Sequence, residues 1–274
     1  MEFGSRWLLR RFNIYPTAYY NYLKDRKHEY REEKSRVQRK IVEIYHSNDG
    51  VPGYRMMCDY LEQAKIIYSC MTVHKYMKEL GLRSIVRRKK PNYVKGTANK
   101  IFPNILNQNF KVEVPNKIWC TDFTYLPQKN GTMRYNCTII DLYDRSAVAT
   151  LDGNHITAEL AMVALKIALE RHKPNKGLIL HSDQGSQFTS KLFNNFCEKN
   201  YIQQSMSRAG CPYDNAPMER FYNTLKHEYF NLYSFNSADE LDQGIYEFIY
   251  MKYNHIRPHS YNGGRTPYAA RYAA

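Results

Sequence analysis

Three acidic residues lie in segments whose composition suits metal-dependent chemistry. Asp122 belongs to the stretch WCTD, Asp183 to HSDQG and Glu219 to DNAPMER, and 35 residues separate the last two acids. This spacing alone carries little weight, because a chain with 26 acidic residues produces such pairs by chance. Their placement is more informative. Two acids belong to expected strands and one to an expected helix start, beside small, polar or glycine residues.

These residue types match the demands of phosphodiester cleavage. The reaction needs an activated attacking oxygen and a stabilised leaving oxygen, and two divalent ions about 3.5–4 Å apart provide both. Mg²⁺ prefers hard oxygen ligands and keeps several waters, so three carboxylates can hold two ions and leave room for phosphate oxygens. Three converging acids would also repel one another without a cation. We therefore predict that Asp122, Asp183 and Glu219 are catalytic and metal-ligating.

Other acids near these segments have simpler interpretations. Asp214 is predicted to cap the helix that follows it, and Asp144 to lie in a turn. Asp141 ends an expected strand not far from Asp122. Both a structural role and a role as a further metal ligand stay open for Asp141.

The helix that carries Glu219 is expected to begin near Asn215. At about 100° per residue, four polar side chains fall within roughly 80° of one face. They are Asn215, Glu219, Asn223 and Lys226. An apolar stripe lies beside them, so the helix can bury one side and present the other to a substrate. We predict that Asn215, Asn223 and Lys226 contact DNA; a solvated lysine is the alternative for Lys226.

The elements around these residues predict a single α/β catalytic domain over residues 118–274. Alternating patterns predict strands at 118–126, 134–143 and 146–151. A helix capped by Thr157 then runs to about His172, followed by a strand at 177–181, a helix at about 190–200 and a strand near 202–205. Three strands followed by alternating helices and strands is the order of a mixed five-stranded sheet.

The N-terminal part of the chain is strongly basic. The net charge is +14, and residues 1–103 hold 22 Lys and Arg against 10 Asp and Glu, whereas residues 104–274 hold 18 against 16. Such a charge favours a polyanionic partner, because phosphate neutralisation supplies most nucleic-acid affinity. A basic protein without a nucleic-acid partner is the alternative.

Three short helices are expected within residues 31–92. They cover Arg31–His46, a stretch after Gly53, and Met71–Leu80 with Ser69 as N-cap and Gly81 at its end. The tight connection between the last two helices suits a helix-turn-helix domain, and a small helical bundle is the alternative. The residues predicted to contact DNA in this region are His74, Lys75, Lys78, Arg87, Arg88, Lys89 and Lys90.

The remaining segments set limits on the class of protein. Residues 1–30 form an N-terminal segment, in which residues 1–5 look like a cloning remnant. Residues 93–117 contain Pro and Asn without periodicity and are predicted to be a linker. The sequence contains no stretch of about 18 apolar residues, which excludes a membrane span. Six scattered cysteines without a CxxC pair argue against a zinc ribbon and a disulfide scaffold, and indicate reduced cysteines in an intracellular protein.

Long motifs in this chain resemble a known family. WCTDFTYLP, HSDQGSQFTS and SMSRAGCPYDNAPMERFYNTLKHE resemble the catalytic motifs of bacterial DDE transposases. More narrowly, they resemble the second-reading-frame product of the IS-three family of insertion sequences, relatives of retroviral integrases. YNHIRPHSYNGGRTPYAA resembles that family's ending. The similarity spans about residues 35 to 270.

The resemblance implies an RNase H-like, integrase-type fold with two Mg²⁺ or Mn²⁺ ions on Asp122, Asp183 and Glu219. It implies that water cleaves one DNA strand and that the freed 3′-hydroxyl attacks another phosphodiester. Lys226, seven residues after Glu219, would contact the element's end. The implied partners are double-stranded DNA (terminal inverted repeats and target), further copies of the chain on DNA, and an upstream frame that supplies end recognition. Retroviral integrases carry an N-terminal His/His/Cys/Cys module that this sequence lacks, so no structural zinc is predicted.

Three functions follow from these observations. The first is an active transposase of the bacterial cytoplasm, associated with the nucleoid. The second is a DNA-binding regulator without catalytic activity, and the third is an RNase H-like nuclease for RNA–DNA hybrids. The basic N-terminal part and Lys226 favour DNA ends as the substrate.

Overall fold

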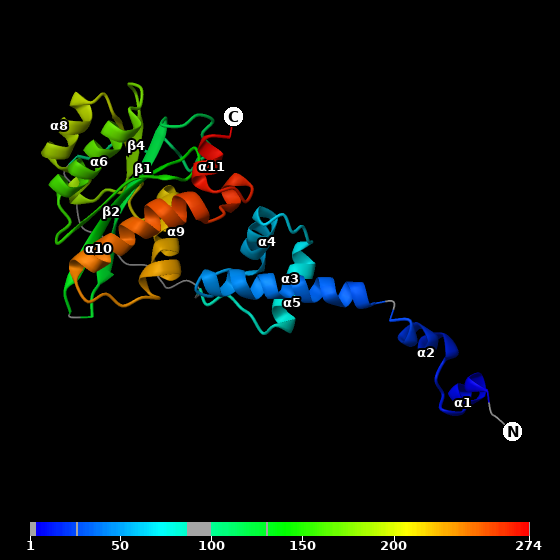
Figure 1. The fold of residues 1–274 in the computed structure, drawn as a ribbon. Helices are drawn as coiled ribbons and strands as arrows, with labels where there is room; N and C mark the ends of the chain where they lie inside the picture. The colour runs from blue at the N-terminus through cyan, green and yellow to red at the C-terminus, as the bar shows by residue number, and fades with distance from the viewer. Residues whose placement is uncertain (1–3, 26, 87–99, 130, 274) are drawn as a thin grey trace. The chain divides into compact units, whose positions relative to one another are not determined.

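The protein consists of two compact units, residues 1–84 and residues 85–274. The computed structural model, drawn in Figure 1, describes residues 4–25, 27–86, 100–129 and 131–273. None of the helices within these residues is long and apolar enough to cross a membrane.

In its described residues, the first unit contains helices and no strand. It contains α1 (Ser5–Arg11), α2 (Pro16–Leu23), α3 (His28–Ser47), α4 (Tyr54–Gln63) and α5 (Cys70–Glu79). The last three share a buried core formed by Val37, Ile41, Ile44, Met57, Tyr60, Leu61, Val73, Tyr76 and Met77. The three helices predicted for this region are therefore confirmed, whereas α1 and α2 lie in a segment for which no element was predicted.

The caps predicted for α5 are present. The Ser69 hydroxyl accepts a hydrogen bond from the Thr72 amide at 3.2 Å, which satisfies one donor of the first helical turn. Gly81 follows the helix with φ +71°, a conformation that glycine adopts without a steric cost. These two residues fix the length of α5.

The second unit is built on a mixed sheet of five strands. The strands are β1 (Ile118–Pro127), β2 (Met133–Asp141), β3 (Ala147–Gly153), β4 (Ile179–Ser182) and β5 (Gln203–Met206), in the order β3-β2-β1-β4-β5. β1, β2 and β3 pair antiparallel, and β4 and β5 run parallel to β1. The predicted five-stranded mixed sheet is confirmed.

Helices cover both faces of this sheet (Figure 1). One face packs against α6 (Ala158–His172), α7 (Ser186–Thr189) and α8 (Lys191–Lys199), with Trp119, Leu165 and Phe188 in the core between them. The other face packs against α9 (Ala216–Leu225), α10 (Ala238–Glu247) and the π-helix η3 (Phe248–Ile256), with Cys120, Leu225 and Ile249 in the core. Short helices complete the unit: η1 (Pro212–Asn215), η2 (Lys226–Phe230), η4 (Ser260–Asn262) and α11 (Pro267–Arg271).

Alternation along β1 determines which of its side chains face α9. Trp119 and Phe123 belong to the core on the α6 side, and Cys120 and Leu126 belong to the core on the α9 side. Because successive side chains of a strand point to opposite faces, Asp122 lies on the α9 side of the sheet.

The described part of the predicted linker is packed onto the sheet domain. The Ile105 amide donates to the Ser205 hydroxyl at 2.9 Å, and the Met206 amide donates to the Pro103 carbonyl at 3.3 Å. Leu106 is buried in the core on the α9 side. Residues 100–117 contain no helix or strand. They are nevertheless part of the second unit and do not form a separate linker. Residues 93–99 of that linker lie outside the described residues.

Candidate active site

The register of the sheet aligns two of the three predicted catalytic acids. β1 and β4 pair in parallel, with Cys120 opposite His181. Two residues further along, this register aligns Asp122 with Asp183, which directly follows β4. Neighbouring strands lie about 4.8 Å apart. The backbone therefore brings these two carboxyl groups to the same level of the sheet.

Helix α9 brings the third acid towards Asp122. The Asn215 side-chain amide donates to the Thr121 carbonyl at 3.3 Å, and the Tyr222 hydroxyl donates to the Asp122 carbonyl at 2.6 Å. Glu219 is four residues after Asn215 and three before Tyr222, so it lies on the same face of the helix as these two residues. That face contacts β1 at Thr121 and Asp122.

Backbone amides orient two of the carboxylates. One oxygen of Asp122 accepts from the Phe123 amide, and one oxygen of Asp183 accepts from the Gly185 amide, both at 2.8 Å. Asp122, Asp183 and Glu219 are each partly buried. Such groups keep access to solvent and substrate while their backbone is held by the sheet and by α9.

The donor chemistry of this region fits a hard divalent cation. Carboxylate oxygens are the ligands that Mg²⁺ prefers. The side-chain oxygen of Asn215 is a further oxygen donor, buried and without a hydrogen-bond partner among the described residues. Within the same residues, no three His, Cys, Asp or Glu side chains are gathered closely enough to hold a metal ion. The metal-ligating role of the three acids thus stays a prediction.

Lys226 begins the π-helical turn η2 at the end of α9 and is partly buried. Burial lowers the pKa of Lys226, and the negative charge of Asp122 opposes this shift. The ammonium group therefore lies within electrostatic reach of Asp122. Asn223 is exposed, as its predicted contact with DNA requires.

Two residues of this region differ from their predicted roles. Asn215, predicted to contact DNA, is only 5% exposed and binds the backbone of β1. Asp214 is not the N-cap of α9, because Asn215 holds that position. The Asp214 carboxylate accepts from the Arg208 guanidinium at 2.9 Å and from Gln108 at 2.8 Å, and Arg208 lowers the pKa of Asp214. Asp214 thus fixes the loop that precedes η1.

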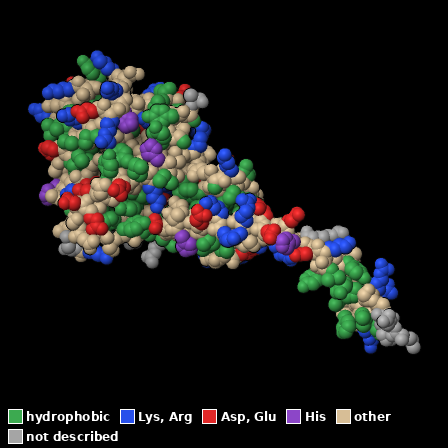
Figure 2. Space-filling view, in the orientation of Figure 1, with side chains coloured by type: hydrophobic (Ala, Val, Ile, Leu, Met, Phe, Trp, Pro, Cys, Tyr) green, Lys and Arg blue, Asp and Glu red, His purple; other side chains and the backbone are tan. Residues whose placement is uncertain are grey.

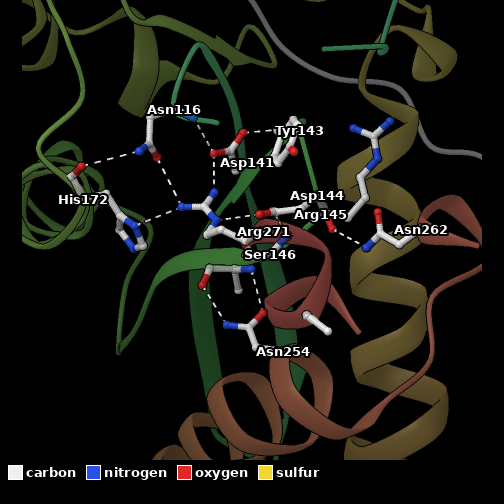
Figure 3. Close-up of polar contacts among 12 residues, drawn as sticks. Asn116, Asp141, Tyr143, Asp144, Arg145, Ser146, His172, Asn254, Asn262 and Arg271 are labelled. Atoms are coloured by element: carbon white, nitrogen blue, oxygen red, sulfur yellow. Dashed lines mark hydrogen bonds and ion pairs between the residues drawn. The ribbon is translucent and has the colours of Figure 1, made fainter. Parts of the chain in front are cut away.

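Asp141 has a structural role (Figure 3). It is fully buried, binds the Arg271 guanidinium and accepts from the backbone amides of Asn116 at 2.7 Å and Tyr143 at 3.0 Å. Asp144 binds the same guanidinium at 2.5 Å and lies in a turn, as predicted. The carboxylate of Asp141 is occupied by these donors, which excludes it as a metal ligand in this structure.

In the helical unit, His74, Lys75 and Lys78 are all exposed on α5. The His74 ring lies 4.9 Å from the ring of Tyr54. Lys and Arg side chains are spread over the face shown in Figure 2, with Asp and Glu between them, so charge on that face does not by itself mark a path for DNA. Arg87, Arg88, Lys89 and Lys90 lie outside the described residues.

Comparisons with known proteins identify the family. Residues 113–212 and 200–267 match two models of the integrase core domain, and residues 31–90 match an HTH-like domain. The transposase for insertion sequence element IS904 of Lactococcus lactis is 36% identical over 83% of this chain and 90% of its own length. The transposase InsF for insertion sequence IS3A of Escherichia coli K12 is 32% identical over 78% of this chain and 75% of its own length. The chain belongs to the IS-three family of DDE transposases.

A solved structure shares the fold of this family member. The simian T-cell lymphotropic virus intasome, in complex with PP2A regulatory subunit B56 gamma, aligns with 85% of this chain and 75% of that chain. The TM-score is 0.50 and the sequence identity is 16%. The predicted RNase H-like, integrase-type core preceded by a helix-turn-helix domain is confirmed.

Sequence reasoning missed two residues of this IS-three transposase that hold functional elements in place. Tyr222 is seven residues after Asn215, the spacing of two helical turns, and this spacing could have placed both on the strand-facing side of α9. Arg271 lies 127 residues from Asp144, and no local pattern connects them.

Proposed function

We propose that this chain is the transposase of an insertion sequence, which cleaves DNA strands at the ends of its element and joins them to target DNA. The observation that supports this proposal is the arrangement of Asp122, Asp183 and Glu219. They come from neighbouring parallel strands and from the helix whose contact face meets β1 beside Asp122. The names of the relatives, which are transposases of insertion sequences, agree with this activity.

The three carboxylates would hold two Mg²⁺ or Mn²⁺ ions. Bound divalent cations would supply Lewis acidity to the attacking and the leaving oxygen. The amides of Phe123 and Gly185 hold the carboxylates of Asp122 and Asp183 in place before substrate binds, which reduces the reorganisation that the reaction requires.

Two substitutions at phosphorus make up the reaction. First, water attacks a phosphodiester at the element's end, one P–O bond breaks, and a 3′-hydroxyl is released. That hydroxyl then attacks a target phosphodiester, so that a new P–O bond replaces the one that breaks. Lys226, close to Asp122, can contact a phosphate of the element's end.

The remaining DNA contacts belong to both units. Asn223 is exposed on α9, and His74, Lys75 and Lys78 are exposed on α5, the helix that we propose as the recognition helix. Arg87, Arg88, Lys89 and Lys90 add positive charge at the C-terminal end of this domain. Because an element has two ends, the protein is proposed to act on DNA as an oligomer, in the bacterial cytoplasm, together with an upstream-frame fusion partner.

Isosteric substitution of one acid tests this function. Asp183→Asn should lower cleavage and joining of terminal-repeat DNA by more than about 100-fold, because loss of a direct ligand should exceed the 10–100-fold cost of losing an outer partner. Binding of the same DNA should persist. Asp239→Asn, the same change at an exposed position of α10, is the matched control and should keep full activity.

Two results would reject the transposase. Unchanged activity of Asp183→Asn would do so, and so would a wild-type protein that binds DNA without nicking it in Mg²⁺ even when fused to its upstream frame. The second result would favour a regulator. An RNA–DNA hybrid in the same assay tests the nuclease alternative, which requires the hybrid to be the preferred substrate.

A further inference from the structure

We infer that the Tyr222 hydroxyl positions Asp122 relative to Glu219 and thereby sets the affinity of the site for divalent cations. This inference rests on the proposed function, since it assigns the metal to these two acids. Tyr222 is a positioning residue rather than a catalytic one, because it acts through the backbone of Asp122.

The hydroxyl bridges two strands at the register position of Asp122. β1 and β2 pair antiparallel, with Asp122 opposite Thr138. The Tyr222 hydroxyl donates to the Asp122 carbonyl at 2.6 Å and accepts from the Thr138 amide at 3.0 Å. It also lies 3.3 Å from the Asn136 carbonyl. One side-chain group from α9 is thus inserted among backbone groups of both strands at the candidate metal ligand.

Burial separates this hydroxyl from solvent. Tyr222 is only 6% exposed, so the partners of its hydroxyl are backbone groups of β1 and β2 rather than water.

The same residue is rigidly connected to Glu219. Tyr222 follows Glu219 by three positions, less than one turn of α9. Asn215, four residues before Glu219, holds the start of the helix on the Thr121 carbonyl. Tyr222 and Asn215 therefore fix α9 to β1 on both sides of Glu219. The separation of the Glu219 and Asp122 carboxylates depends on these two attachments.

A purely structural role would involve the ring rather than the hydroxyl. The ring belongs to the core on the α9 side and lies 5.4 Å from the ring of Phe221 in an edge-on contact. Tyr222→Phe keeps this packing and removes only the bridge. The Asp122 carbonyl and the Thr138 amide then lose the group that links them, so α9 no longer holds the backbone of Asp122 through this hydroxyl.

The experiment compares Tyr222→Phe with Tyr253→Phe in the full-length chain. Tyr253 is a matched control: it is buried in the same core, and its hydroxyl donates to the Arg145 carbonyl at 3.1 Å. Two quantities are measured, Mn²⁺ binding to the DNA-free protein by calorimetry and the Mn²⁺ dependence of strand transfer. Tyr222→Phe should weaken Mn²⁺ binding about 10-fold, the size expected for loss of an outer partner of a ligand.

The rate of strand transfer at saturating Mn²⁺ should stay within about threefold of the wild type, because the acids themselves are intact. Tyr253→Phe should change neither quantity. Mn²⁺ binding that is equal in Tyr222→Phe and the wild type would overturn the inference, and it would do so even where Asp183→Asn had abolished activity and supported the proposed function.

If Tyr222→Phe does not fold, a second variant tests the inference. Tyr222→4-aminophenylalanine retains a donor at the end of the ring and should restore Mn²⁺ binding to within about threefold of the wild type. If this variant binds Mn²⁺ as weakly as Asp183→Asn does, the inference is overturned, because a donor at the end of the ring would then have no effect on the site.

Discussion

The sheet domain contains two groups of acids whose surroundings are opposite. Asp141, at the end of β2, and Asp144, in the turn that follows, are fully buried and share the guanidinium of Arg271, as Figure 3 shows. Asp122 and Asp183, on β1 and after β4, are only partly buried, and Lys226 is a cation whose charge interacts with that of Asp122. The first group is paired with a residue of the chain itself, whereas the second is the group that we propose to bind a cation from solution.

The difference shows why residue type does not identify a catalytic acid. A buried carboxylate must be paired, because an ion transferred from water into the protein loses several kcal/mol of solvation. Arg271 provides that pairing for two acids and attaches α11 to β2. Acids that serve a substrate cannot be neutralised in this way, since an internal cation would occupy the place of the metal.

The largest effect, a loss of stability, is expected when the guanidinium shared by Asp141 and Asp144 is removed. Arg271→Met leaves two buried acids without their partner and should lower the free energy of unfolding by about 3–5 kcal/mol. Urea denaturation measures this loss. Strand transfer per folded molecule should be unchanged, because Arg271 contacts the structural acids and not the candidate site.

The exposed pair of Lys166 and Glu170 on α6 serves as the control. Its side chains are 64% and 65% exposed at a separation of 3.8 Å, so Lys166→Met should cost no more than about 0.5 kcal/mol. A similar loss in both variants would show that burial does not distinguish the Arg271 cluster from an ordinary surface ion pair.

Asp152 on β3 is a third case, an acid whose surroundings favour the protonated form. Burial raises its pKa to about 7, the charge of Asp242 adds to this effect, and Arg134 opposes it while binding Asp242 at 2.9 Å. The folded state therefore keeps a proton that the unfolded chain has released, and stability should fall as the pH rises from about 4 to 7.

Asp152→Asn removes this dependence and retains an acceptor for the Asn136 amide, now 3.1 Å from Asp152. At pH 8 the variant should be more stable than the wild type by about 1–2 kcal/mol, allowing for the partial exposure of Asp152. At pH 4 the two proteins should be equal. Thermal unfolding across this range measures the difference, and a constant difference would assign Asp152 a normal pKa.

Much of this organisation was predictable from local patterns. The strands, the helices capped by Thr157 and Ser69, and the order of the elements follow from alternation, periodicity and capping residues. The pairing of Asp141 with Arg271 was not, because the two positions lie 130 residues apart and the sequence left a metal-binding role open for Asp141. The burial of Asn215 was missed for a related reason: helical periodicity places a residue on a face but does not show what that face meets.

The smallest of the predicted effects is the stabilisation of the folded protein by Mg²⁺. This effect distinguishes the two groups of acids directly. A cation that binds only the folded state stabilises it by RT ln(1 + [L]/Kd), about 1 kcal/mol at five times its Kd. Mg²⁺ added to DNA-free protein should therefore raise the midpoint of thermal unfolding, and EDTA should reverse the gain. Asp183→Asn should lose this gain, whereas Arg271→Met should keep it despite its lower stability. A gain that persists in Asp183→Asn would mean that Mg²⁺ stabilises the protein elsewhere, and the contrast between paired acids and acids open to a metal would not hold.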